Sequence, residues 1–454
     1  MAEPLTLHPR QRRLAFSALI MATVIAVLDI SAVNLALPII AADLHLPISQ
    51  ALWLSKANLL ACAVAILPCS ALGDVIGHRR CLFSGLAILG LASLGCALSS
   101  DLWLLITLRA VQGCAGAAIM CSTLVLLREI YGPKQLGMAL GLNALFVAVT
   151  TTSAPAISGL ILSYASWRWL FVIAPALALA ALVLGRTRVP EKRQRGAGFD
   201  ALGSVLLVAI ALLGLAHYLQ WLPAMALLAL LPLGGVFIWQ QRYSLCPLLP
   251  LQLFANARFD YSLACSTLAF VGQSAVFIAL PITLQQGLGY DPLMTALLFL
   301  PWPLTTALVG PWAGRQADRR QPRLVACAGL VLLASGLALL AAVPASAPAW
   351  HLIVATMLCG AGFGLFQSPN NREILTNAGT GHTARASALL SASRLLGQAL
   401  GALLVGVFLA DAAQTSDAGQ FDPRVAQMFG WCAALQVATL VVGALLYRAK
   451  PQEA

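Results

Sequence analysis

The sequence predicts an all-α integral membrane protein with about fourteen transmembrane helices. Three observations predict this class. Hydrophobic residues make up 60% of the 454 residues and charged residues only 9%, whereas soluble proteins carry about 25% charged residues. Apolar runs long enough to cross a bilayer follow one another along the whole chain, with short polar breaks between them. Lysine and arginine are largely confined to alternate breaks.

The basic residues orient the predicted helices. If the N-terminus, every second loop and the C-terminus face the cytoplasm, most of the 27 lysines and arginines lie on that side. The opposite side holds Arg168 and Arg424, and Lys56, Arg109 and Arg394 fall within helices. This asymmetry obeys the positive-inside rule and explains the net charge of +11 without a nucleic-acid partner. We therefore expect a multi-pass protein of a bacterial inner membrane with both termini in the cytoplasm.

A weak internal repeat divides the chain. Segment 70–74 is similar to segment 314–318 in the second half. The Gly113–Gly116 pair likewise corresponds to glycines at 360–364. Two six-helix halves separated by an extra helix pair explain this repeat, and paired halves are a transporter architecture. The predicted divisions are a cytoplasmic N-terminus (1–13), the N-terminal six-helix half (14–186), a linker with the extra transmembrane pair (187–259), the C-terminal six-helix half (260–447) and a cytoplasmic C-terminus (448–454).

Asp29 lies about halfway along the first apolar run, and no other acidic residue lies as deep in any run. A charge at mid-bilayer costs about 2.5–3.5 kcal/mol even on lenient insertion scales. Such residues are typically proton or cation sites, so we expect solute movement across the membrane with protons as the coupling ion. The alternative is a structural acid paired permanently with a buried arginine. No Walker-type motif is present, which argues against an ATP-driven pump.

We expect no enzymatic activity, no metal and no organic cofactor. The sequence lacks the clustered Asp, Glu and His residues that metal-assisted lipid chemistry needs. Its 11 cysteines show no metal-ligand spacing. An integral-membrane enzyme and a non-transporting sensor are the remote alternatives. The expected partners are a small-molecule substrate, protons and the lipid bilayer, and we expect a monomer.

The loop after the second run, GDVIGHRR, joins two predicted helices tightly. A carboxylate ends one helix, a glycine permits the turn and two arginines begin the next, so charge-assisted bonds across the helix ends can latch one conformation. The alternative is that the arginines only obey the positive-inside rule. A partial copy in the second half favours the latch. The latch residues are Asp74, Gly77, Arg79 and Arg80 and, in the copy, Asp318 and Arg319.

With these motifs the chain resembles the major facilitator superfamily over essentially its whole length. The loop is similar to that family's G-x-x-x-D-x-x-G-R-R/K signature, and LITLRAVQGCAGAA is similar to its proton-coupling motif in the fourth span. LDISAVNLALP resembles the first-span motif of the fourteen-span drug:proton antiporter branch. The segments LPWPL and GAGFGLFQSPNN are similar to those of YebQ-type transporters.

The resemblance implies the major facilitator fold and a proton-coupled secondary transporter that works by alternating access. An antiporter that exports small amphipathic or cationic compounds, as in multidrug efflux, is the expected activity. Arg109 is then expected to act with Asp29 in proton coupling. The fifth-span motif departs from G-P-x-x-G-G to A-P-A-I-S-G, which leaves symport open. The residues expected to pack helices closely are Gln112, Gly113, Pro155 and Gly159.

Lys56 is an unexpected charge, because the family commonly has asparagine at this place. If the second span starts near Gln50, Lys56 lies about 9 Å below the outer surface and can extend to water. Otherwise it faces the cavity, where it either pairs with Asp29 across Asn34 or attracts an anionic group of the substrate. The last option supports a second candidate function, the export of an anionic or zwitterionic metabolite.

Trp302 lies between two prolines in the middle of its run. A kinked helix that presents an indole to the cavity suits apolar or cationic aromatic ligands, and core packing is the alternative. The other candidate substrate contacts are Asn34, Lys56, Asn58, Asn143, Phe146, Gln273, Phe366 and Gln367.

Overall fold

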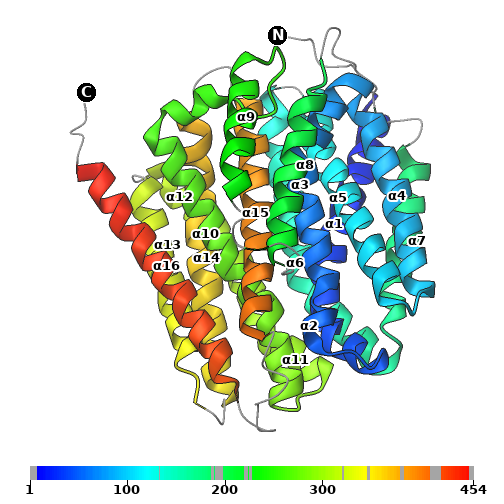
Figure 1. Cartoon of the computed structure of the whole chain (residues 1–454), viewed down its shortest axis with the longest axis vertical. Helices are drawn as coiled ribbons and strands as arrows, with labels where there is room; N and C mark the ends of the chain where they lie inside the picture. The colour runs from blue at the N-terminus through cyan, green and yellow to red at the C-terminus, as the bar shows by residue number, and fades with distance from the viewer. Residues whose placement is uncertain are drawn as a thin grey trace.

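The computed structural model describes residues 8–131, 133–185, 189, 198–218, 223, 228–319, 322–344, 348–378, 383–409 and 421–448. The chain is helical through these residues, with short turns and no strand (Figure 1). The helices are α1 (Pro9–Asp43), α2 (Ile48–Ala51), α3 (Trp53–Ile76), α4 (His78–Leu98), α5 (Leu102–Ile130), α6 (Pro133–Tyr164), α7 (Arg168–Gly185), α8 (Ala201–Tyr218), α9 (Leu230–Tyr243), η2 (Leu251–Ala255), α10 (Ala257–Ile282), η3 (Thr283–Gly287, π-helical), α11 (Pro292–Phe299), α12 (Pro301–Arg319), α13 (Pro322–Ala341), α14 (Ala349–Asn377), α15 (Thr383–Leu409) and α16 (Pro423–Arg448).

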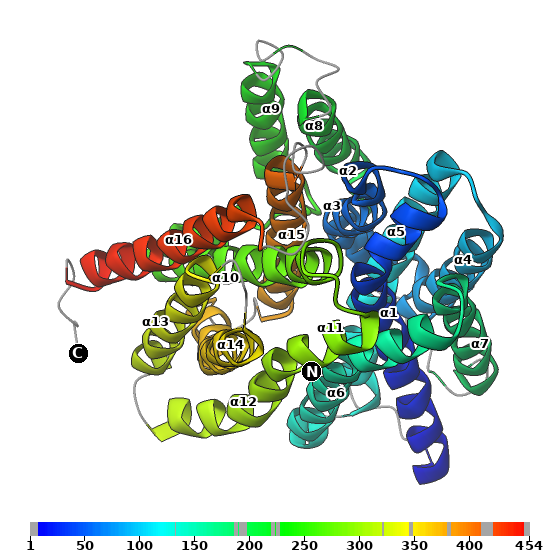
Figure 2. The same ribbon diagram turned by 90° about the horizontal axis from the view of Figure 1, so that it is seen from below.

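In the described part of the chain, 12 helical stretches are long and apolar enough to cross a membrane. Consecutive helices combine in three of them: α2 with α3, α10 with η3, and α11 with α12. The predicted extra pair corresponds to α8 and α9, which run side by side at one edge of the molecule (Figure 2). The apolar stretch of α8, Ala201–His217, is shorter than the other spans. The all-α membrane fold is confirmed, and the membrane crossing of the extra pair stays a prediction.

The two halves are visible as separate bundles, α1 to α7 and α10 to α16, with α8 and α9 beside their junction (Figure 2). Their packing repeats: α5 packs against α3 and α4, and α14 packs against α13 and α12. Glycines permit both close approaches. A Cβ atom at Gly113 would overlap the carbonyl oxygen of Asn58, and one at Gly360 would overlap the carbonyl oxygen of Trp302. Gly116 faces open space, so only the first glycine of the predicted pair is a helix contact.

The halves are joined differently at the two ends of the bundle. We call the end with the α3–α4 turn the basic end and the end with α2 and α11 the opposite end; they lie at the top and bottom of Figure 1. Toward the opposite end, one continuous apolar core contains residues of both halves, including Leu37 and Leu284. Gln285 also donates a hydrogen bond from Nε2 to the carbonyl oxygen of Leu35 (3.0 Å). Toward the basic end each half has a core of its own. A smaller buried cluster joins Cys62, Ile66 and Ala117 of one half to Leu395 of the other.

Asp200 ties together the two ends of the extra helix pair. Its Oδ1 accepts hydrogen bonds from the backbone N–H of Gly203 (2.8 Å) and from Nε2 of Gln240 (2.6 Å). Its Oδ2 accepts one from Nε2 of Gln241 (2.7 Å). The carboxylate therefore caps the start of α8 and holds the end of α9 beside it.

Candidate functional site

Asp29 of α1 and Arg109 of α5 form a buried ion pair. The Nη1 atom of Arg109 lies 2.8 Å from Oδ2 of Asp29, and the two side chains are 1% and 5% exposed. The Nη2 atom of Arg109 is 3.5 Å from the backbone oxygen of Asp29. Pairing neutralises two charges that would each be costly at this depth, since a lone buried charge carries a penalty of several kcal/mol. The two residues predicted to act together are thus in direct contact.

The remaining donors of Arg109 have neutral partners. Nε donates to the carbonyl oxygen of Leu54 in α3 (3.1 Å), and Nη1 also donates to Oε1 of Gln112 (2.8 Å). Gln112 in turn donates from Nε2 to Oγ of Ser93 in α4 (2.6 Å). The guanidinium consequently keeps hydrogen-bond partners even if its contact with the carboxylate breaks. The predictions from sequence missed Leu54 and Ser93; the first acts through its backbone, and neither has a charge that would single it out.

Asn58 of α3 connects the pair to a third helix. Its Nδ2 lies 3.3 Å from both Oδ2 of Asp29 and the carbonyl oxygen of Arg109. We expected Asn58 to contact substrate, but it lies within the ion-pair network. Gly113 allows this arrangement because any larger side chain there would overlap the backbone of Asn58. The predicted packing glycine therefore sets the distance between α3 and the ion pair.

Lys56 is buried within the protein and does not extend to water. It is 3% exposed, and its Nζ lies 4.8 Å from the ring centroid of Trp53, a cation–π distance. Asn34, the predicted bridge between Lys56 and Asp29, instead accepts a hydrogen bond from Oγ of Ser55 (2.6 Å). The interpretation in which Lys56 snorkels is therefore wrong for this conformation.

The aromatic candidates differ from expectation. α11 ends at Phe299 and α12 begins at Pro301, so Trp302 lies at a helix junction and is 0% exposed. Its ring packs edge-on against Phe277, with centroids 5.4 Å apart. Phe366 is also buried. These two residues belong to the core in this conformation, which corrects the prediction that the Trp302 indole faces a cavity.

The other candidate substrate contacts are dispersed. Asn143 of α6 accepts a hydrogen bond at Oδ1 from Thr23 of α1 (3.3 Å). Phe146 is 40% exposed, Gln273 is buried and Gln367 is partly buried. No single described pocket contains them, so their role as substrate contacts stays a prediction.

The predicted latch has the expected turn, but its carboxylate, Asp74, pairs with a histidine and not with an arginine. Gly77 has φ 101°, a left-handed conformation that strongly favours glycine. Asp74 pairs with Nε2 of His78 (3.0 Å), and the Arg79 guanidinium lies 5.8 Å from the ring centroid of Phe83. Arg80 is exposed. The side chains of the copied latch residues, Asp318 and Arg319, lie outside the described residues.

Pro155 and Gly159 lie within α6, where that helix meets α11 of the other half. A Cβ atom at Gly159 would lie 2.8 Å from Cβ of Ala296 and 3.0 Å from the carbonyl oxygen of Pro292. Gly159 thus lies at a contact between the halves at the opposite end. A larger side chain at Gly159 would separate α6 from α11.

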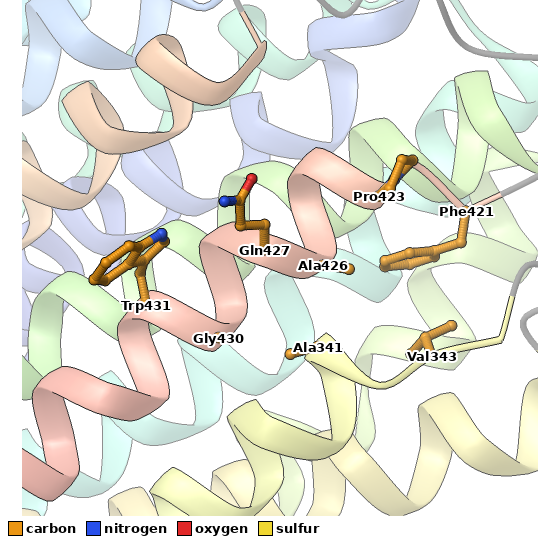
Figure 3. Close-up of a pocket in the computed structure, with 8 residues that line it drawn as sticks. All are labelled: Ala341, Val343, Phe421, Pro423, Ala426, Gln427, Gly430 and Trp431. Atoms are coloured by element: carbon orange, nitrogen blue, oxygen red, sulfur yellow. The ribbon is translucent and has the colours of Figure 1, made fainter.

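An apolar hollow of about 700 Å³ lies between α13 and α16, beside Phe421 and Trp431 (Figure 3). Its lining includes Ala341, Val343 and Gln427 and none of the predicted site residues. It is therefore separate from the buried ion pair.

Two helical bundles that repeat one packing pattern and bury an acid–arginine pair define the class of secondary transporters. The chain belongs to the Major Facilitator Superfamily, whose sequence model matches residues 19–402 and, in a second match, 262–454. This confirms the resemblance found in the motifs. The protein is a multi-pass integral membrane transporter of small molecules, and neither this family nor this fold is that of an enzyme.

The chain is similar to named members of that family. It is 38% identical over 408 residues to the uncharacterized transporter YebQ of Escherichia coli, covering 88% of this chain and 89% of that protein. It is 28% identical over 393 residues to the multidrug resistance protein Stp of Mycobacterium tuberculosis, covering 84% of this chain and 73% of that protein. A solved bacterial homologue of the human drug peptide transporters PepT1 and PepT2 shares the fold, with a TM-score of 0.67, 14% identity and coverage of 97% and 100% of the two chains.

Proposed function

We propose that the protein is a proton-coupled antiporter that exports small amphipathic or cationic compounds by alternating access. The observation that carries this proposal is the buried Asp29–Arg109 pair, which lies at the depth where proton-coupling residues are found in transporters. Protons are then the coupling ion. The basic end faces the cytoplasm according to the positive-inside rule.

The network gives Asp29 two chemically distinct states. When ionised, the carboxylate accepts hydrogen bonds from Arg109 and Asn58. When protonated it loses the charge that attracts the guanidinium, which keeps Gln112 and the Leu54 carbonyl as partners. Proton binding therefore weakens the contact between α1 and α5 without stripping Arg109 of all its hydrogen bonds.

This change can drive movement of the halves because α1 joins both of them. Leu35 accepts a hydrogen bond from Gln285 of the other half, and it follows Asp29 by less than two helical turns. A shift of α1 at Asp29 is transmitted to that contact along one rigid helix. A proton crossing a potential of 100 mV supplies about 2.3 kcal/mol, enough to bias two conformations of similar energy without ATP.

Export of drug-like compounds is supported by the similarity to a protein named for multidrug resistance. A second candidate, export of an anionic or zwitterionic metabolite, is favoured by Lys56, whose buried ammonium would attract a negative group. The two candidates differ in the charge of the cargo and share the proton step.

Transport by purified protein in proteoliposomes tests the proposal. A panel of cationic, neutral and anionic compounds is offered under an imposed pH gradient. We expect wild-type protein to move a cationic dye such as ethidium, and Asp29→Asn to reduce that flux by about tenfold or more. The matched control is Asp43→Asn, which changes a half-exposed carboxylate at the end of the same helix and should retain the flux.

Lys56→Asn separates the two cargo classes. If the natural cargo is anionic, wild-type protein moves anionic members of the panel and the substitution abolishes that flux. If the cargo is cationic, Lys56→Asn leaves ethidium flux unchanged or raises it. Undiminished pH-driven flux of every transported compound in Asp29→Asn would contradict the proton assignment in both cases.

A further inference from the structure

A second cavity lies at the basic end, between the halves. It has a volume of about 480 Å³ and is bounded by α3 and α5 of one half, α15 of the other and the segment 245–248 after α9. We call it the basic-end chamber. Its polar lining residues are Ser70, Asp74, Arg128, Arg385, Ser387 and Ser391. It contains none of the residues of the buried ion pair.

Arg128 gives the chamber wall a positive charge, and its hydrogen-bond partner there is the neutral hydroxyl of Ser387. This partly buried side chain of α5 donates from Nη2 to Oγ of Ser387 in α15 (3.0 Å), so the bond crosses between the halves. A guanidinium has five N–H donors, and one hydroxyl satisfies only one of them. A partly buried cation facing a hydroxyl is better stabilised by an added anion than by the wall alone.

Arg385 adds a second positive charge from the other half. It lies in the first turn of α15 and lines the same chamber. The N-terminal end of a helix carries a partial positive charge, which further favours an anion there. Asp74 is the one acidic residue in the described lining, and its carboxylate already pairs with His78 at 3.0 Å.

Membrane orientation alone does not explain this arrangement. The positive-inside rule requires arginines at the basic end but is satisfied equally well by exposed ones such as Arg242 of α9. It does not require two arginines from different halves to line one recess. The chamber is thus a recess with net positive charge in its described lining.

We propose that the basic-end chamber binds a phosphate-bearing anion between Arg128 and Arg385, bridging α5 and α15. Phosphate has several acceptor oxygens, so one phosphate group can accept hydrogen bonds from guanidinium groups of two different helices. The lining also has apolar side chains, including Leu67, Val125 and Leu248, that suit an acyl chain. A phospholipid headgroup and a soluble phosphate share this chemistry, and the bound anion stabilises the conformation in which the halves touch at the basic end.

Ligand titration of the purified full-length protein in a neutral detergent tests the proposal without any transport assay. The probes are dioctanoyl phosphatidylglycerol and inorganic phosphate, with dioctanoyl phosphatidylcholine as the zwitterionic lipid, and binding is measured by calorimetry. We expect at least one anionic probe to bind more tightly than phosphatidylcholine. Arg128→Gln and Arg385→Gln should each weaken that binding by roughly tenfold, whereas Arg242→Gln should leave it unchanged.

Binding of phosphatidylglycerol alone would assign the chamber to a lipid headgroup, and binding of phosphate with the same dependence on both arginines would assign it to a soluble anion. Two results would overturn the proposal: no binding of either probe, or an equal loss in Arg242→Gln and in the chamber variants. Since Arg385 is exposed, its variant decides the outcome if Arg128→Gln does not fold.

Discussion

Arg109 holds three helices together through one planar group. Its guanidinium contacts a carboxylate of α1, a carbonyl oxygen of α3 and an amide of its own helix. A lysine ammonium has three donors on a flexible stem and cannot reproduce this fixed fork. Charge alone is therefore not sufficient at this position.

Arg109→Lys should keep the ion pair possible and still reduce pH-gradient-driven transport by about tenfold or more, because the bond to Leu54 is lost. Flux in proteoliposomes at equal protein content measures this. The matched control is Arg168→Lys, which alters an exposed arginine–carboxylate pair with Asp43 at 3.0 Å. Such pairs contribute about 0–1 kcal/mol, so flux should change little. Full activity of Arg109→Lys would mean that charge suffices.

Gly113 and Gly116 offer a comparison within one helix. A Cβ atom at Gly113 would overlap the Asn58 backbone, whereas one at Gly116 has no atom within 4 Å. Gly113→Ala should destabilise the protein by about 1–3 kcal/mol through overpacking. Gly116→Ala should be neutral or slightly stabilising, since alanine favours helix. Thermal unfolding in detergent measures both, and equal melting temperatures would contradict the close approach of α3 and α5.

Part of the hydrogen-bond network around Arg109 could be predicted from the sequence. The depth of Asp29 and the motif around Arg109 predicted that they act together, and the structure places them 2.8 Å apart. The bonds from Arg109 to Leu54 and from Gln112 to Ser93 were not predictable. These bonds depend on backbone position and side-chain rotamer, which cannot be inferred from the residue types alone.

At the scale of single elements, the α8–α9 pair depends on one carboxylate. Asp200 accepts three hydrogen bonds from the start of α8 and the end of α9, and it is buried. Few other contacts fix this pair, since α8 touches α3 only lightly and much of its surface is exposed. The pair is therefore held as a unit mainly at the basic end.

Asp200→Ala should cost about 2–3 kcal/mol, because it leaves buried amide groups without an acceptor. Limited proteolysis should then cut the region around α8 and α9 faster than in the wild type. Asp101→Ala is the matched control: that carboxylate caps α5 through a single bond to Leu104 at 2.8 Å, and its loss should cost about 1 kcal/mol. Identical cleavage rates in both variants would contradict the role of Asp200 in holding the start of α8 beside the end of α9.

Element boundaries explain why Trp302 is buried in this conformation, as in the core-packing alternative, and does not face a cavity. The run 292–314 reads as one apolar helix with prolines in it, but the helix breaks between Phe299 and Pro301. The residue after the break packs into the core against Phe277. A pattern of apolar residues and prolines predicts a kink; it does not predict which way the side chain beyond the kink points.

At the scale of the whole molecule, the halves are asymmetrically joined. They share one large apolar core toward the opposite end, whereas toward the basic end each half has its own core. A smaller cluster that includes Leu395 of α15 and the hydrogen bond from Arg128 to Ser387 also link the halves. Gly159 against Ala296 and Gln285 against Leu35 add contacts at the opposite end. The internal repeat predicted two halves. It could not predict which residues of one half contact which residues of the other. Alternating access requires that these contacts at the opposite end break and that the two halves rearrange at the basic end, where α15 already packs against α3.

The measurement that separates a coupling role of Asp29 from a structural one is proton movement driven by substrate. Proteoliposomes are loaded with the most actively transported compound of the panel, and internal pH is followed with a trapped dye while that compound flows down its gradient. Wild-type protein should move protons in the opposite direction. Asp29→Asn should exchange labelled for unlabelled compound, which shows that it is folded, and move no protons. Proton movement of wild-type size in Asp29→Asn would show that the coupling carboxylate is elsewhere.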